Sequence, residues 1–89
     1  MEKSPVEAAK WFRKAAEQGN VTSQYYLGVM YSAGQGVQQD YVQAHKWFNL
    51  AALKGRADAI AYRRELAELM SADEIAVAQR EARAWISSH

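Results

Sequence analysis

The chain has 89 residues, enough for one small domain, and its 49% hydrophobic and 24% charged residues are typical of a globular protein rather than a disordered one. The formal net charge of +1 gives no electrostatic reason to expect binding to nucleic acid or to acidic lipid. The absence of cysteine excludes disulfides and thiol chemistry, and no apolar run approaches the roughly 20 residues of a membrane span.

The first predicted element is a helix over 5–18. Ser4 can cap its free amides, and Pro5 is well tolerated at the first helical position. Apolar side chains at helical spacing then form one face, which is expected to be core: Ala8, Trp11, Phe12 and Ala15. Gly19 can adopt the left-handed conformation that ends a helix.

A second helix is predicted over 21–33, capped by Asn20. Its apolar stripe consists of Leu27, Met30 and Tyr31. Gly28 lies in the middle of this helix, where glycine costs about 1 kcal/mol relative to alanine. A close contact with a neighbouring helix, under Trp11 or Trp47, is expected to offset that cost.

A glycine-rich loop over 33–39 separates these helices from the rest of the chain. Asp40 then caps a third predicted helix over 41–54, and Gly55 ends it. A fourth helix is predicted over 57–70. Its inner face consists of Ala59, Leu66 and Met70.

The last predicted helix covers 72–86. Ser71 and Glu74 have the spacing of a capping box at its start. One face of this helix is apolar and carries Ile75, Ala78, Ala82 and Trp85. No strand pattern competes anywhere, so the predicted fold class is all-α.

The sequence of the first helix returns in the third. Segments 6–19 and 42–55 are identical at eight of fourteen positions, at an offset of 36 residues. A repeat of this period indicates stacked supersecondary units, and such units form extended surfaces that bind other macromolecules. The sequence therefore predicts one α/α solenoid domain over 1–89, with repeat 1 over 5–39, repeat 2 over 40–70 and a C-terminal capping helix over 71–87.

A specific combination of motifs covers about residues 5–62. It comprises 8–20, 27–31 and 34–41, and then a second set at Ala44, Trp47, Phe48, Ala51, Ala52 and Gly55. This combination resembles the Sel-1-like repeat (SLR) family, a relative of the tetratricopeptide repeats. The resemblance implies pairs of antiparallel helices that stack into a solenoid.

The second repeat departs from this pattern after Tyr62, where Arg63 and Arg64 replace the leucine and glycine of the first repeat. Segment 47–85 resembles the closing repeat and terminal helix of SLR proteins. A solenoid end needs such a change, because the last repeat must not present apolar surface to a missing neighbour. Arg63 and Arg64 are otherwise expected to be a solvated charge pair.

The resemblance implies a protein–protein interaction module, often a bacterial adaptor, with neither catalysis nor a cofactor. A partner protein or peptide would bind along the first helix of each repeat, because these A helices line the inner surface of the curve. That surface is predicted to be basic in the first repeat and partly apolar in the second. The candidate partner-binding residues are Lys10, Arg13, Lys14, Lys46, Asn49, Leu50 and Leu53.

Two interpretations of this surface are open. In the first, it is a groove for an acidic peptide segment that also supplies an aliphatic anchor. In the second, Leu50 and Leu53 pack under the helix at 72–86 and the lysines only increase solubility.

Self-association is an alternative function. Repeat arrays generally need about three units for stability, and here two units and a cap are predicted. We therefore expect that the chain is either the C-terminal part of a longer array or a homodimer that pairs through its first two helices.

An enzyme is the least favoured class. Some cysteine-rich SLR relatives are linked to β-lactam binding or hydrolysis, but this chain has no cysteine and no serine–lysine motif. His45 is expected to be an ordinary histidine on a helix surface, because His89 is the only other histidine and the pair has no zinc-site spacing. Residues 1–5 lack an apolar signal region, which favours a cytoplasmic protein, or a periplasmic or secreted one if a leader has been removed.

Overall fold

The computed structural model describes residues 4–89, so residues 1–3 of the predicted domain lie outside it. The described part contains helices and no strand, which confirms the all-α prediction. The helices are α1 (Pro5–Glu17), α2 (Val21–Ala33), α3 (Tyr41–Leu53), α4 (Ala57–Ala67) and α5 (Ala72–Ser88).

The helices begin where local capping signals place them. The predicted caps Ser4, Asn20, Asp40 and Ser71 each accept a hydrogen bond from the backbone amide three residues further on. At Ser71 the bond is reciprocal, because the Glu74 carboxylate accepts from the Ser71 amide at 2.9 Å. These bonds satisfy amides that have no partner within the helix.

Helix α4 ends earlier than the predicted boundary at residue 70. The amides of Glu68, Leu69 and Met70 donate to carbonyls three residues back instead of four, at 3.2, 2.9 and 3.2 Å. This tighter spacing is that of a 3₁₀ turn, which often closes an α-helix.

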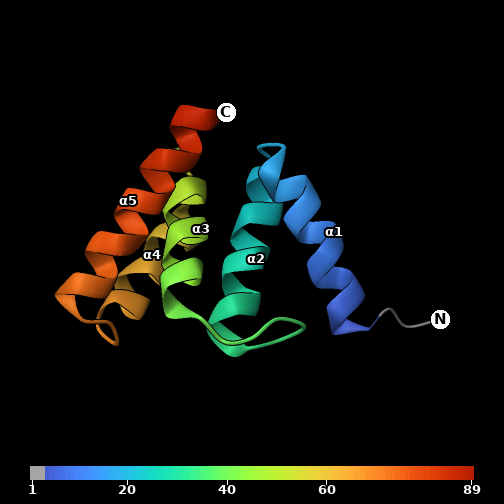
Figure 1. The fold of residues 1–89 in the computed structure, drawn as a ribbon, viewed down its shortest axis with the longest axis horizontal. Helices are drawn as coiled ribbons and strands as arrows, with labels where there is room; N and C mark the ends of the chain where they lie inside the picture. The colour runs from blue at the N-terminus through green and yellow to red at the C-terminus, as the bar shows by residue number, and fades with distance from the viewer. Residues whose placement is uncertain (1–3) are drawn as a thin grey trace.

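The helices stack in chain order along the longest axis of the molecule, from α1 at one end to α5 at the other (Figure 1). α1 packs on α2 and α3 on α4, while the most extensive contact joins α2 to α3. α5 packs on α3 and closes the far end of the stack. This arrangement is an α/α solenoid, as predicted.

The close approach expected at Gly28 exists, but the neighbour is Phe48 rather than Trp11 or Trp47. A Cβ atom on Gly28 would lie 2.8 Å from two carbons of the Phe48 ring. Phe48 is fully buried and stacks on Tyr62, with ring centroids 5.5 Å apart and an interplanar angle of 11°. The absence of a side chain at Gly28 therefore allows α2 and α3 to approach closely.

The loop between α2 and α3 returns to the start of α1. Gly36 has a φ of +71°, and a Cβ atom there would collide with the Pro5 carbonyl. Glycine is thus required at this position for its backbone conformation and for the space. The contact ties the loop to the first helix.

The three tryptophans lie in α1, α3 and α5, and their environments differ. Trp11 and Trp47 occupy equivalent positions of the two repeats, whereas Trp85 lies near the C-terminal end of α5. Trp47 is buried and meets Trp85 edge to face, with centroids 6.1 Å apart. Trp11 is 61% exposed, so the prediction that it belongs to the core is wrong. Trp47 is enclosed because α5 covers α3, whereas Trp11 lies on the helix at the other end of the stack.

Candidate partner-binding groove

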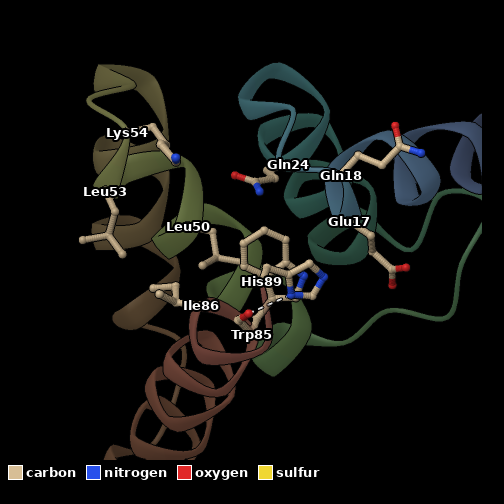
Figure 2. Close-up of a pocket in the computed structure, with 10 residues that line it drawn as sticks. Glu17, Gln18, Gln24, Leu50, Leu53, Lys54, Trp85, Ile86 and His89 are labelled. Atoms are coloured by element: carbon tan, nitrogen blue, oxygen red, sulfur yellow. Dashed lines mark hydrogen bonds between the residues drawn. The ribbon is translucent and has the colours of Figure 1, made fainter.

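An open groove of about 470 Å³ lies between the α1–α2 turn on one side and the C-terminal ends of α3 and α5 on the other. Figure 2 shows the side chains that line it. Its volume is within the usual range of small ligand pockets. The lining residues are Glu17, Gln18, Gly19, Gln24, Leu50, Leu53, Lys54, Trp85, Ile86 and His89.

One wall of the groove is apolar. Leu50 forms part of a buried cluster that includes Trp47 and Ala82 and against which Trp85 packs. Leu53 lies one turn further along α3 and is 63% exposed. Ile86 of α5 is also 47% exposed, so the rim of this wall presents aliphatic surface to solvent.

Two buried polar atoms of the groove lack partners within residues 4–89. Gln24 is fully buried, and its Nε2 donates to the Ala16 carbonyl at 3.1 Å, but its Oε1 accepts no hydrogen bond. The Nε1–H group of Trp85 is likewise unpaired. An unsatisfied buried polar group costs about 1–3 kcal/mol. Gln24 and Trp85 line the groove, but these two atoms are themselves enclosed, so each is a polar group that the fold leaves unsatisfied beside the groove.

Opposite charges lie on the two sides of the groove. Glu17, the last residue of α1, and Lys54, which follows α3, lie on opposite sides of the groove, and the Glu17 carboxylate points away from Lys54 (Figure 2). The His89 ring stacks on Trp85 with centroids 4.0 Å apart, and its Nδ1 lies 2.8 Å from the Trp85 carbonyl oxygen. The groove is thus apolar along one wall and charged at its rim.

The structure brings only two of the seven candidate residues together in the groove, namely Leu50 and Leu53. The packing interpretation holds for Leu50, which is buried beside Trp85, but it is wrong for Leu53. The reason is that Leu50 packs in a cluster to which α1, α2 and α5 contribute, whereas Leu53, the last residue of α3, remains outside it.

The other candidates are dispersed over the surface. Lys10 and Lys14 line a shallow depression around Trp11 on α1. The Arg13 guanidinium donates to the hydroxyl of Tyr31 on α2. These residues lie outside the groove, and a common binding role for them stays a prediction.

The two α3 candidates outside the groove have neighbours within the chain. The Lys46 ammonium lies 4.7 Å from the centroid of the Trp47 ring. Asn49 accepts a hydrogen bond from Arg63 at 2.6 Å, so Arg63 is not simply solvated. The groove residues that the candidate set omitted come from the end of α1, the α1–α2 turn, the first turn of α2, the end of α3 and the C-terminal part of α5. Among these residues, the sequence indicated only Trp85, through the apolar face predicted for the helix at 72–86.

His45 is buried, with 3% of its surface exposed, so the prediction of a helix-surface histidine is wrong. It occupies the position of Ala9 in the first repeat, and that alanine is buried too. Burial lowers the pKa of His45, and the nearby positive charge of Arg63 lowers it further. His45 is therefore neutral in the folded protein near neutral pH.

Within residues 4–89, no group of three or more histidine, cysteine, aspartate or glutamate side chains could hold a metal ion. None of the helices in this part of the chain has the length and apolar character needed to cross a membrane.

The sequence model of the Sel1 repeat matches residues 1–20 and 21–55. The chain belongs to the Sel1 repeat family. The second match spans α2, the loop and α3, the pair of helices with the most extensive contact. Sel1 repeats are generally protein–protein interaction modules and typically are not enzymes.

A solved structure supports the same assignment. The chain is 34% identical to a protective antigen of uropathogenic Escherichia coli strains that has an SLR fold, with a TM-score of 0.91. The similarity covers 98% of this chain and 19% of that protein, so the chain spans about a fifth of its length. No curated protein matches the chain significantly. The fold and family predicted from the repeat are thus confirmed.

Proposed function

We propose that this chain is a binding module, without catalytic activity, that holds an extended segment of a partner protein in the groove between the α1–α2 turn and α5. The observation that supports this is the combination of an open apolar wall with two unpaired polar atoms, Gln24 Oε1 and Trp85 Nε1. The likeness to an Escherichia coli antigen makes a bacterial adaptor the favoured setting.

The chemistry of the groove defines the segment that would fit. An aliphatic or aromatic side chain would pack between Leu53 and Ile86, which removes apolar surface from water. Both polar atoms are enclosed in the unbound protein, so the Gln24 and Trp85 side chains would have to turn toward the groove on binding. A backbone N–H group of the segment would then donate to Gln24 Oε1, and a carbonyl would accept from Trp85 Nε1–H. Both polar atoms would then be satisfied, so binding would recover free energy that the unbound protein loses.

Selection from a random peptide library, followed by affinity measurement by calorimetry, tests this proposal. Selected peptides are expected to share one apolar anchor. Leu53→Lys should weaken their binding at least tenfold, equivalent to about 1.4 kcal/mol. The matched control is Leu69→Lys, because Leu69 is also exposed, at 67%, and lies outside the groove. Equal effects of the two substitutions would contradict the proposal.

Self-association through α1 is a second candidate function. Its support is the exposure of Trp11, which lies with Lys10 and Lys14 in a depression on the face of α1. Light scattering over a concentration series would then show a dimer that Trp11→Gln dissociates. A monomer at every concentration would eliminate this alternative and leave the groove proposal unaffected.

A further inference from the structure

A second cavity, of about 360 Å³, lies where α3, α4 and α5 meet. Its lining contains two arginines, a histidine, two side-chain amides and no carboxylate. The polar lining residues are His45 and Asn49 from α3, Arg63 and Arg64 from α4, and Gln79 from α5. The side chains of all five carry N–H groups, and among these only Arg63 donates a side-chain hydrogen bond within residues 4–89, so the cavity is rich in hydrogen-bond donors.

The charge of the two arginines is not compensated within the described part of the chain. Arg63 is half-buried, and its hydrogen-bond partner is the neutral amide oxygen of Asn49 at 2.6 Å. Neither Arg63 nor Arg64 forms an ion pair with a carboxylate of residues 4–89. Arg56 shows the contrast, because its guanidinium pairs with Asp58 at 2.7 Å. A guanidinium group is suited to bidentate contacts with carboxylate or phosphate oxygens.

His45 provides an independent observation at the same cavity. Only 3% of the His45 surface is exposed, and the Nδ1 atom of its ring has no hydrogen-bond partner among residues 4–89. A neutral imidazole still carries one N–H donor. The charged residues that line the cavity with it are Arg63 and Arg64 of α4, of which Arg63 acts on His45 electrostatically, while α5 contributes the uncharged Ile75 and Gln79.

We propose that this cavity is an oxyanion-binding site, in which Arg63 and Arg64 contact a carboxylate or phosphate group and His45 and Gln79 supply further donors. The site is separate from the partner-binding groove and does not depend on it. An anion here would neutralise the uncompensated arginine charge and would use donors that are otherwise unpaired.

The experiment is a titration of the folded protein with inorganic phosphate and, separately, with acetate, followed by NMR of the arginine Nε–H and histidine ring signals. Sodium chloride at matched ionic strength controls for screening. Saturable shifts at Arg63 and His45 with either oxyanion, at millimolar affinity or tighter, are expected. Binding of phosphate alone indicates a phosphoryl group as the natural ligand, and binding of acetate as well indicates that a carboxylate also fits.

Variants make the result specific. Arg64→Gln changes an exposed side chain and should weaken phosphate binding at least tenfold without unfolding the protein. Arg80→Gln is the matched control, because Arg80 is an exposed arginine of α5 outside the cavity. Sulfate keeps its charge at the pH values where histidine titrates. A bound sulfate favours the protonated imidazole, so the pKa of His45 measured in sulfate should be higher than in chloride. Absence of saturable shifts, or equal effects of the two variants, would overturn the proposal.

Discussion

Replacement of Gly28 by alanine is expected to destabilise the protein, although alanine is the better helix former. The added Cβ would lie 2.8 Å from two carbons of the Phe48 ring, whereas carbon atoms in favourable contact lie about 3.5–4.0 Å apart. The ring cannot move away cheaply, because it is fully buried, stacked on Tyr62 and 6.0 Å from the ring of Tyr25.

Two opposing effects set the magnitude. Removal of glycine from a helix interior gains about 1 kcal/mol, whereas overpacking of a core costs about 1–3 kcal/mol. With a cost of about 2 kcal/mol, the middle of that range, the net loss for Gly28→Ala is about 1 kcal/mol. For a domain of this size, that loss lowers Tm by about 4–8 °C. Thermal unfolding followed by far-ultraviolet circular dichroism measures it.

The same substitution in a protein that also carries Phe48→Leu separates the steric clash from the helix propensity of alanine. In a Phe48→Leu protein the smaller side chain leaves room for the Cβ, so Gly28→Ala should become stabilising by up to about 1 kcal/mol. The two positions are thus expected to show a coupling energy, as contacting residues do. The reasoning is refuted if Gly28→Ala raises Tm in the parent protein, or if its effect is the same in both backgrounds.

Three further perturbations test other contacts. Gly36→Ala should lower Tm more than Gly55→Ala, since both glycines have positive φ but only Gly36 lacks space, beside Pro5; equal losses would contradict this. Burial lowers the pKa of His45, so the unfolded chain, with an ordinary pKa near 6.5, takes up the proton first as the pH falls. The free energy of unfolding in urea should therefore fall below about pH 6.5, and it should fall less in the His45→Gln variant. The same pH dependence in both proteins would contradict a lowered pKa for His45. Ser71→Ala should cost about 1 kcal/mol in the same assay, through loss of the α5 cap, and a neutral result would show that the cap is dispensable.

The helices could be predicted because their signals are local. Ser71 caps α5 through an amide three residues away, and Gly19 ends the α1 turn with a φ of +93°. Such contacts join residues that are close in the sequence, so the local sequence is enough to predict them. The α4 boundary was less accurate, because the closing 3₁₀ turn at 68–70 has no distinctive residue pattern.

The groove could not be predicted in the same way, because its residues come from three separate parts of the chain. Leu50 and Leu53 are both apolar replacements in α3, yet one is buried and the other exposed. The packing of α1, α2 and α5 around Leu50 distinguishes them. The unpaired state of Gln24 Oε1 also depends on what lies around it in space, and no spacing rule reveals it.

The sequence alone determined the repeat, the family and the order of the helices, because helical periodicity and capping act over a few residues and the repeat recurs at a fixed offset. The tertiary structure decided which of the recurring side chains are covered. Trp11 and Trp47 occupy the same local motif, but Trp47 is enclosed by α5 while Trp11 remains mostly exposed. Burial depends on the neighbours that packing supplies, and identical motifs at different places in a solenoid have different neighbours.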